Sequence, residues 1–431
     1  MEKTRLEKDM KESGIEWVGK IPENWKIAKN NRLFTISKSL VGDMWSSTQL
    51  LSLTKSGIIE KNINDGGGKQ PESFSTYQFV EKDDIVLCLF DIDVSAVFSD
   101  RSNYSGMISP AYRVMKCNDA ILPSFAKWWF DAVNIGRYYL IYTKSLRKTI
   151  DSEGFGNILT AIPPKEEQKA ISEYLYNQCS KIDSLINEAK ISIEEYKKLK
   201  QAVIYEIVTK GIETDVEMVE SGDEWLGVYP KNYNIGQLSM LSNIVRGGSP
   251  RPAGDPRYYG GDIPFMRISD ITKDERIYVD SCVHTITQEG LSRTRMIPAN
   301  TLLLTNSGAT LGVPKINTFE TTFNDGIAAF LDLDERLNIV YVYYFLKAKT
   351  SYFLECASMG MGQPNLNTDI IGRTKIVFPS MEKQSEIVDY LEEKCNKLEA
   401  LIIRKHELVK DLEQYKKSLI YEVATGKRKV V

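Results

Sequence analysis

One stretch of 24 residues occurs twice in this chain. PPKEEQKAISEYLYNQCSKIDSLI, residues 163–186, returns as PSMEKQSEIVDYLEEKCNKLEALI, residues 379–402, without a gap. The match continues over residues 163–209, where 15 of 47 positions are identical to residues 379–425. Because self-similarity at a fixed distance marks duplicated structural units, the sequence predicts one unit that is used twice.

A shorter repeat precedes the first one. SGIEWVGKIPENWKI, residues 13–27, matches SGDEWLGVYPKNYNI, residues 221–235, at 8 of 15 positions. The copies are 208 residues apart here and 216 apart in the longer repeat, so the second copy carries a net 8 additional residues. We place these before Thr301, in the stretch 246–261, whose Gly, Pro and Arg content predicts a long loop.

The long repeated segments carry a heptad stripe of mostly apolar residues, which we call the seam. Its positions are Leu175, Cys179, Ile182, Ile186, Ala189, Ile193, Tyr196, Lys200, Val203 and Ile207 in the first copy, and Leu391, Cys395, Leu398, Ile402, Lys405, Val409, Leu412, Lys416, Leu419 and Val423 in the second. A 4,3 alternation over about five heptads predicts a coiled coil. Lys200 and Lys416 occupy equivalent seam positions, where a polar residue lowers stability but fixes the register.

We expect the two long helices to pair with each other in antiparallel orientation, because two equal stripes in one chain bury each other without the entropy cost of association. Each helix would span about 65 Å at about 1.5 Å per residue. Antiparallel pairing would relate the two copies by a pseudo-twofold axis and place the heads at opposite ends. Two alternatives are that each helix packs on its own head and that the helices form a homodimerisation arm.

The regions before the long helices predict mixed α/β heads. Strands are expected in 49–54, 84–90, 111–115, 263–268, 300–305 and 327–333, and helices from Pro123 through Tyr139 and over 339–356. The fold class is therefore α+β, with two mixed α/β domains separated by two long antiparallel coiled-coil helices. The expected boundaries are a charged segment 1–12, a first head 13–162, a first long helix 163–212, a second head 213–378 and a second long helix 379–431.

Composition narrows the function classes. The chain has 431 residues, 42% hydrophobic and 26% charged, which indicates two to three globular units. The charged N-terminus and the lack of a long apolar run predict a cytoplasmic protein without contact to a membrane. A net charge of −3 excludes DNA binding driven by overall charge, but not by a local basic face. The six cysteines and two histidines lack the spacing of a zinc site.

No motif for catalysis or nucleotide binding is complete. Residues 14–20 match the G-x-x-x-x-G-K part of a P-loop, but Ile21 stands where Ser or Thr must bind magnesium, and the second copy has Val228 in place of the lysine. We instead expect Trp17 and Trp225 of these segments to pack into the heads. Since methyltransferase, protease, hydrolase and kinase signatures are also missing, no catalytic and no metal-binding residue is predicted.

Basic and aromatic residues in both heads fit contact with DNA. The candidates in the first head are Arg101, Arg137, Tyr142, Lys144, Arg147 and Lys148. Those in the second head are Arg246, Ser249, Arg251, Arg257, Tyr258, Arg267, Arg293, Arg295, Asn306, Ser307, Gln363 and Asn365. Lys and Arg release counterions from phosphates, and Arg and amide side chains can discriminate base edges. A solvated helix end in the first head, and turn formation around residues 360–367, would explain some of the same residues.

Taken together, the chain resembles the specificity subunit of type I restriction-modification enzymes over essentially its whole length. The resemblance rests on SGIEWVGKIPENW at 13–25, GGSPRPAGDPRYYGGDIPFMRISDI at 247–271, GATLG at 308–312, MGQPNLN at 361–367, and the helix entries IPPKEEQ at 162–168 and FPSMEKQ at 378–384. The first head departs from this pattern. It has FDIDVSAV at 90–97 where the second has NSGATLGV at 306–313, and it lacks a GGSPR loop.

The resemblance implies a non-catalytic DNA-recognition subunit of a methyltransferase and endonuclease complex that acts in phage defence. Each head would be a target recognition domain for one half of a bipartite, asymmetric site in double-stranded DNA, and the helix pair would set the spacer. Two modification subunits using S-adenosylmethionine, and two restriction subunits using ATP and magnesium, would dock on the chain, which itself would bind no cofactor. The alternative is a coiled-coil scaffold with protein-binding heads.

Overall fold

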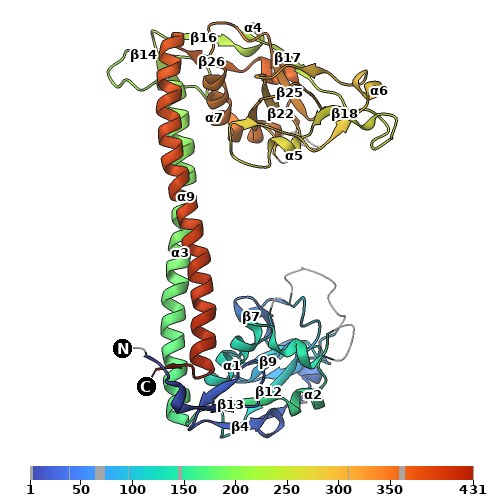
Figure 1. The fold of residues 1–431 in the computed structure, drawn as a ribbon, viewed down its shortest axis with the longest axis vertical. Helices are drawn as coiled ribbons and strands as arrows, with labels where there is room; N and C mark the ends of the chain where they lie inside the picture. Colours follow the sequence, from blue (N-terminus) through green and yellow to red (C-terminus); the bar gives the residue numbers. More distant parts are fainter. Residues whose placement is uncertain are drawn as a thin grey trace. The chain divides into compact units, whose positions relative to one another are not determined.

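The computed structural model describes residues 3–37, 39–63, 73–95, 97–143, 148–308, 310–358 and 365–430. The chain divides into two compact units, Met1–Lys190 with His406–Val431, and Ile191–Lys405. Each unit holds one head and one part of each of two long helices, α3 (Lys165–Lys210) and α9 (Met381–Ala424) (Figure 1). The predicted α+β class is confirmed.

The first head contains two four-stranded sheets. One has the order β10 (Ser99–Arg101), β9 (Ile85–Leu87), β12 (Arg113–Cys117), β5 (Phe34–Ile36), and the other has the order β7 (Gly57–Lys61), β6 (Leu50–Thr54), β11 (Gly106–Ile108), β8 (Gln78–Val80). Helix α1 (Pro123–Ile135) packs against β9 and β10, and its buried Trp129 and Phe130 lie in the main core of the unit. This core continues onto both long helices.

The second head repeats this arrangement. Its sheets have the orders β17 (Asn243–Arg246), β25 (Ile327–Leu331), β22 (Leu302–Thr305), β23 (Pro314–Asn317), β19 (Tyr278–Val279), and β20 (Thr285–Ile286), β18 (Tyr259–Met266), β24 (Thr321–Phe323), β21 (Met296–Ile297). Helix α7 (Ile339–Ser358) packs against β23 as α1 packs against β10. The β6–β11 and β18–β24 pairs are both parallel. The two heads therefore share strand order and direction, and β19 is an addition in the second.

Short strands, helices and 3-10 turns make up the rest of the fold. The paired strands are β1 (Lys3–Thr4) with β27 (Arg428–Lys429), β2 (Met10–Glu12) with β3 (Lys20–Pro22), β4 (Lys26–Lys29) with β13 (Leu159–Ile162), β14 (Met218–Glu220) with β15 (Val228–Pro230), and β16 (Asn234–Gln237) with β26 (Lys375–Phe378). The short helices are α2 (Ser152–Asn157), α4 (Leu238–Leu241), α5 (Ile268–Ile271), α6 (Gln288–Leu291) and α8 (Thr368–Gly372), with 3-10 turns η1 (Glu7–Asp9), η2 (Asn30–Arg32), η3 (Gly42–Ser47) and η4 (Tyr138–Tyr142).

The strand-like runs of the sequence form strands in both heads. They contain β6, β9, β22 and β25, together with the first three residues of β12 and the second half of β18. The helix that begins at Pro123 ends at Ile135, earlier than expected, and Tyr139 lies in η4 instead. Likewise β18 begins at Tyr259, so the predicted long loop is shorter at its end than the 246–261 stretch.

Every seam position is buried or half-buried, so the heptad prediction is confirmed. Within the first unit, Lys416 Nζ lies 2.6 Å from Asp183 Oδ1, and Lys190 Nζ lies 3.8 Å from Glu413 Oε1. From the first pair to the second, the residue number rises in α3 and falls in α9, so the helices are antiparallel. Within the second unit, Ile204 and Val208 of α3 share a core with Leu391 and Cys395 of α9. In each unit the seam is thus covered from within the chain.

The seam shifts where the helices meet the heads. Ile204 and Val208 are more buried than the predicted Val203 and Ile207, because the second head packs on that side of α3. At the equivalent end of α9, Ile420 and Ala424 are buried in the core of the first unit. These ends therefore serve the heads as well as the partner helix.

A buried glutamine joins each long helix to its head. Gln168 Oε1 accepts a hydrogen bond from Leu122 N at 2.7 Å, and its Nε2 donates to Ala120 O at 3.0 Å and Pro163 O at 2.9 Å. Leu122 precedes α1, so these bonds fix the start of that helix against the start of α3. Gln384 makes the equivalent bonds in the second unit, to Asn338 N at 2.8 Å, Arg336 O at 2.7 Å and Pro379 O at 2.9 Å.

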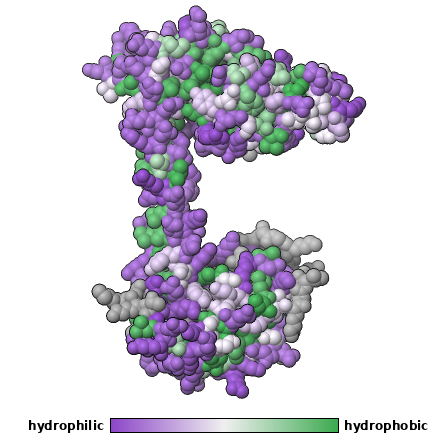
Figure 2. Space-filling view, in the orientation of Figure 1, coloured by the Kyte–Doolittle hydropathy of each residue, from purple (hydrophilic) through white to green (hydrophobic). Residues whose placement is uncertain are grey.

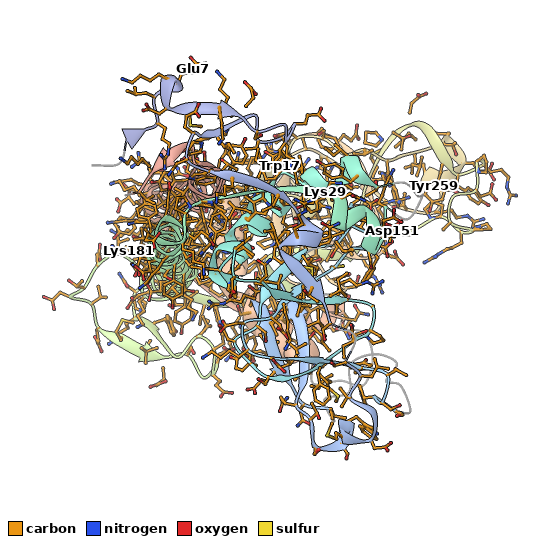
Figure 3. The ribbon with its side chains drawn as sticks, turned by 90° about the horizontal axis from the view of Figure 1, so that it is seen from below. Glu7, Trp17, Lys29, Asp151, Lys181 and Tyr259 are labelled. Atoms are coloured by element: carbon orange, nitrogen blue, oxygen red, sulfur yellow. The ribbon has the colours of Figure 1, made fainter. Side chains whose placement is uncertain are left out.

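The two tryptophan segments pack into the heads, as predicted. The Trp17 ring lies 5.2 Å from that of Trp129, among the packed side chains of the first unit (Figure 3). The hydroxyl of Tyr421 donates to Trp17 O at 3.1 Å. The equivalent Trp225 ring lies 5.5 Å from that of Phe345, and the hydroxyl of Tyr205 donates to Trp225 O at 2.9 Å. The segment that resembles part of a P-loop is therefore a packing element.

Both ends of the chain belong to the first unit. Strand β1 pairs with β27, and Arg5 N donates to Lys427 O at 3.0 Å. The guanidinium of Arg5 forms an ion pair with Glu167 at the start of α3. No helix within the described ranges is long and apolar enough to cross a membrane.

Replacing Gln168 with Met keeps the length of the side chain but leaves Leu122 N–H and two carbonyl groups without their partner. A buried polar group left unpaired costs about 1–3 kcal/mol, so we expect a lower melting temperature for the first unit and faster hydrogen exchange at the start of α1. Calorimetry and hydrogen-exchange mass spectrometry measure both.

The control is Gln414→Met, the same substitution at an exposed position of α9. It should change neither quantity. Wild-type exchange at the start of α1 in Gln168→Met would contradict the role of this glutamine.

Candidate nucleic-acid interface

The loop between β17 and β18 lies close against two other backbone segments of the second head. A Cβ on Gly247 would stand 2.3 Å from Asn324 O, and one on Gly248 would stand 2.3 Å from Arg293 O. Two glycines are therefore needed where the loop passes between the β24–β25 turn and the segment after α6. This packing brings Arg246, Ser249 and Arg251 next to residues that are more than 40 positions away in sequence.

Asp325, in the turn between β24 and β25, contacts three candidate residues of this loop. Its Oδ1 accepts a hydrogen bond from Ser249 Oγ at 2.6 Å, and its Oδ2 lies 3.8 Å from Arg251 Nη2. Its backbone carbonyl accepts a hydrogen bond from Arg246 Nε. The structure thus brings Arg246, Ser249 and Arg251 together around one residue, Asp325. We call residues 246–251 with Asn324, Asp325 and Gly326 the Asp325 cluster.

Tyr259 and Arg267 lie at the base of the same loop. The Tyr259 hydroxyl donates to Pro250 O at 2.7 Å, which fixes the middle of the loop. The guanidinium of Arg267 lies 5.9 Å from the centre of the Tyr259 ring and 5.8 Å from that of Phe265. Such cation–π contact holds Arg267 beside the loop without using all of its hydrogen-bond donors.

Arg257 and Tyr258 form a separate pair further along the loop. Arg257 Nη2 donates to Asp255 Oδ2 at 2.7 Å, and its guanidinium lies 5.3 Å from the centre of the Tyr258 ring. The hydrogen bond with Asp255 raises the pKa of Arg257, and the same bond lowers the pKa of Asp255. Tyr258 is buried and Arg257 is exposed. Arg257 therefore places a positive charge at the surface, whereas the Tyr258 side chain is packed in the interior of the head.

The remaining candidates of the second head differ in exposure. Arg293 and Arg295 are exposed in the segment after α6, beside Gly248. Figure 2 shows mostly hydrophilic side chains over the end of the head that carries β18 and α6 (Figure 2). Ser307 is half-buried and pairs with the exposed Asn365 in an isolated bridge. Gln363 lies outside the described residues.

Asn306 differs from the other candidates because it is buried, with 1% of its surface exposed. Its backbone N donates to Gly326 O at 2.9 Å, and its backbone O accepts from Leu366 N at 2.8 Å. Its side-chain amide has no hydrogen-bond partner among the residues that the structure describes. In this conformation Asn306 joins the β24–β25 turn to the segment before α8, and its amide does not reach the surface.

The candidates of the first head lie in two different places. Arg137, in the left-handed region with φ 48°, donates from Nη1 to Ile92 O at 2.9 Å and also to Asp93 O. Lys148 lies beside it, because its backbone O accepts from Ile92 N at 3.2 Å, and its side chain is exposed. Tyr142 packs edge-on against Tyr139, and burial raises the pKa of Tyr142. Lys144 and Arg147 lie outside the described residues.

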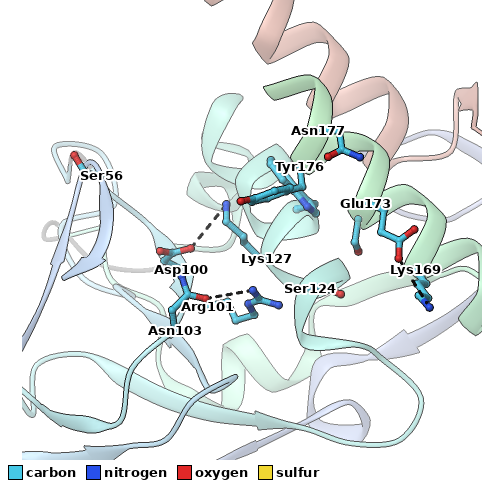
Figure 4. A pocket seen from close by; sticks show the side chains of 12 residues that line it. Ser56, Asp100, Arg101, Asn103, Ser124, Lys127, Lys169, Glu173, Tyr176 and Asn177 are labelled. Atoms are coloured by element: carbon cyan, nitrogen blue, oxygen red, sulfur yellow. Dashed lines mark hydrogen bonds and ion pairs between the residues drawn. The ribbon is translucent and has the colours of Figure 1, made fainter. Parts of the chain in front are cut away.

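Arg101 is not brought together with Arg137 and Lys148. It ends β10 and lines a cavity of about 540 Å³ with Lys127, Trp128 and Tyr176, beside the start of α3 (Figure 4). Its nearest polar partners are Asn103 Oδ1 at 3.3 Å and Asp83 Oδ1 at 3.7 Å. Asp83 precedes β9 and Ile92 follows it, so Arg101 and Arg137 lie at opposite ends of that strand.

The seam lysines each meet a carboxylate of the opposite helix. Lys200 Nζ lies 2.7 Å from Glu399 Oε2, and Lys416 Nζ lies 2.6 Å from Asp183 Oδ1. Asp183 and Glu399 are 216 residues apart, as are Lys200 and Lys416. The two ion pairs are therefore equivalent contacts of the repeat.

Sequence reasoning missed Asp325, Tyr259 and the close-packed Gly247. Asp325 stands before a glycine, as in many turns, and nothing in its local sequence indicates a partner 76 residues earlier. Tyr259 could have been noticed as an aromatic residue at the end of an arginine-rich loop. Within the described ranges, no group of three or more His, Cys, Asp or Glu residues is arranged to hold a metal ion.

Comparison with known sequences gives one consistent family. Residues 230–408 match the model of the type I restriction modification DNA specificity domain. The chain is 30% identical over 169 residues to the MjaIX specificity subunit of Methanocaldococcus jannaschii, covering 38% of each chain. It is 28% identical over 157 residues to the HindI specificity subunit of Haemophilus influenzae, covering 36% of this chain and 33% of that one. The matches thus span less than half of these two relatives.

Comparison with solved structures covers nearly the whole chain. A chain from a structure described as the basis of complex assembly and conformational transition of the type I R-M system aligns with a TM-score of 0.71 and 13% identity, covering 94% of this chain and 99% of that one. The HsdS subunit from Thermoanaerobacter tengcongensis aligns with a TM-score of 0.53 and 13% identity, covering 94% and 98%. At such low identity these alignments show a common fold.

Proposed function

We propose, on the premise that this chain belongs to the specificity subunits of type I restriction-modification systems, that its two heads read different halves of one bipartite DNA target. The observation that carries the proposal is the contrast between a repeated framework and divergent loops. The glutamine bonds, the tryptophan contacts and the strand order recur in both units. Within the part of the first head that the structure describes, the turn that corresponds to the Asp325 cluster, residues 109–112, has no acidic residue.

The corresponding turn of the first head has different chemistry. It precedes β12 and consists of Ser109, Pro110, Ala111 and Tyr112, none of which is charged. Gln78 Nε2 donates to Ser109 O at 3.2 Å and to Tyr112 O at 3.0 Å. Since base edges are distinguished by the donors and acceptors placed against them, heads with different polar loops favour different half-sites, and the target is asymmetric.

Double-stranded DNA would be bound through both phosphate contacts and base contacts. Lys148, Arg293 and Arg295 are exposed cations suited to phosphates, which contribute affinity without sequence information. Arg246 and Arg251 are suited to base edges because a guanidinium offers paired donors. Arg137 donates from Nη1 to two carbonyl groups of the first head and would therefore shape the loop around Ile92.

The chain would act as a non-catalytic member of a larger assembly. Two modification subunits would dock along the helix pair and use S-adenosylmethionine to methylate adenine, and two restriction subunits would use ATP and magnesium to translocate and cleave DNA. All three of these cofactors would bind the partner subunits. The equivalent ion pairs Lys200–Glu399 and Lys416–Asp183 would fix the helix register and thereby the spacer between the half-sites.

The direct test is selection of a random double-stranded DNA library by the full chain with its modification subunits, followed by methylome sequencing of cells that express the complex. We expect one split, asymmetric sequence with methylated adenines, and affinity that falls steeply with salt. Binding to proteins without any selection of DNA sequence would favour the scaffold alternative. Cleavage or methylation of DNA by the purified chain alone would show an enzyme instead.

Arg251→Ala should relax the half-site read by the second head and leave the other half-site unchanged. Loss of a base contact costs about 1–3 kcal/mol at one position, which is measurable as a flattened base preference in the library selection. Arg373→Ala is the matched control. Arg373 is an exposed arginine that follows α8 and lies near Asn243, the first residue of β17, whereas Arg251 lies in the loop after the last residue of β17. Equal loss of affinity for all sequences would identify Arg251 as a phosphate contact.

Removing one heptad from both helices should shorten the preferred spacer. Deleting residues 189–195 together with 404–410 keeps Lys416 opposite Asp183 and Lys200 opposite Glu399. Seven residues correspond to about 10 Å of helix, or about three base pairs at about 3.4 Å each. The same library selection measures the spacer. Deleting 189–195 alone is the control that disrupts the register, and an unchanged spacer in the double deletion would contradict the proposal.

A further inference from the structure

Asp325 contributes a negative charge to a surface that is otherwise rich in arginine. Its carboxylate accepts from Ser249 Oγ at 2.6 Å and lies 3.8 Å from Arg251 Nη2. Its side chain is 43% exposed and that of Arg251 is 73% exposed, so both groups face solvent. A carboxylate on a surface that binds phosphates opposes binding, and its presence therefore needs an explanation other than affinity.

We propose that Asp325 is a positioning and specificity-determining residue of the second head, which holds Ser249 and Arg251 for base readout and penalises DNA that does not engage them. This inference rests on the proposed function and deepens it. The carboxylate lies 3.8 Å from Arg251 Nη2 and would therefore compete with a base edge or a phosphate for this guanidinium. DNA of the correct sequence would give Arg251 new hydrogen-bond acceptors on a base edge. Other DNA offers no such acceptors and is repelled by the negative charge of the Asp325 carboxylate.

The two contacts of the carboxylate have different strengths, which suits this role. The Ser249 bond is short and charge-assisted, the stronger class of hydrogen bond. The Arg251 contact is long and exposed to solvent, and such ion pairs contribute little. The first contact therefore fixes the loop, while the second is readily exchanged for DNA.

The loop has other means to stay folded when Asp325 is replaced. Gly247 N donates to Ile327 O at 3.1 Å, and Gly248 N donates to Phe323 O at 3.1 Å. The Tyr259 hydroxyl still bonds Pro250 O at 2.7 Å. Replacement of Asp325 should therefore alter the placement of Ser249 and Arg251 without unfolding the head.

The role is restricted to the second head, since the corresponding turn of the first head, residues 109–112, contains no acidic residue. A change at Asp325 should therefore affect one half-site only. A general effect on folding or on net charge would instead affect both half-sites.

The test compares Asp325→Asn, Asp325→Ala and wild type as full chains in complex with the modification subunits, by library selection and by titration with non-specific DNA. Asp325→Asn keeps an oxygen that accepts from Ser249 but removes the charge. We expect its affinity for non-specific DNA to rise a few-fold and its preference at the second half-site to fall about tenfold. Asp325→Ala should lose more of that preference, because the Ser249 bond is lost too.

Two further variants separate positioning from charge. Glu335→Gln removes the same charge at an exposed site beyond the other end of β25, and both half-sites should remain as in wild type. Ser249→Ala should lower the preference at the second half-site without raising the affinity for non-specific DNA. Melting temperatures of all variants should match that of wild type.

The outcomes distinguish this inference from the function on which it rests. Wild-type preference at the second half-site in both Asp325 variants would overturn the inference and leave the proposed function intact. Equal loss at both half-sites, together with a lower melting temperature, would show a merely structural residue. If the wild-type complex selects no sequence at all, the proposed function itself fails.

Discussion

Burial of the seam between α3 and α9 holds each unit together, because a helix with an apolar stripe of this length gains most of its stability from packing. In each unit the apolar stripes of the two helices bury each other, and the ends of both helices also form part of the core of a head. The ion pairs Lys416–Asp183 and Lys200–Glu399 lie on this seam at equivalent positions. A sliding of one helix along the other would separate both pairs, so the seam has one preferred register.

The anchoring of the heads follows from the same repeat. Gln168 and Gln384 each join three backbone groups at the point where a long helix begins, and buried amides of this kind tolerate few substitutions because every bond must be replaced. Around these fixed points the heads share a strand order. The loops lie outside these shared contacts, and their polar groups differ between the two copies. A repeated framework with divergent loops is what the proposed reading of two different half-sites would require.

In the proposed function, the specificity of the second head would depend on a balance of positive and negative charge. Arginines attract any DNA, and the counterions that they release contribute affinity for every sequence alike. Asp325 and Asp255 each place a carboxylate beside an arginine, at 3.8 Å from Arg251 and 2.7 Å from Arg257, which would lower the gain from unspecific phosphate contact. The net charge of −3 agrees with a protein whose cations are local and partly compensated.

Much of the framework was determined by the sequence itself. The heptad stripe, the two offsets and the apolar runs of the heads depend on spacing along the chain, and burial follows such periodic spacing directly. Packing of Trp17 and Trp225 could be predicted from the repeat, because both copies have the tryptophan, whereas Lys20 of the first copy is Val228 in the second. Helix ends were less predictable, as α1 shows, because the chain turns at Gly136 before Tyr139 packs back on the core.

Only the tertiary structure decided which candidate residues meet. Asp325 contacts Ser249 and Arg251 because β17 and β25 are neighbours in a sheet, although 76 positions separate Asp325 from Ser249. Arg101 and Arg137 lie apart because they flank opposite ends of β9, and Asn306 is buried because two segments close over it. A one-dimensional pattern reports which face of an element is apolar, but contacts between loops depend on strand order and loop packing, which only the folded chain fixes.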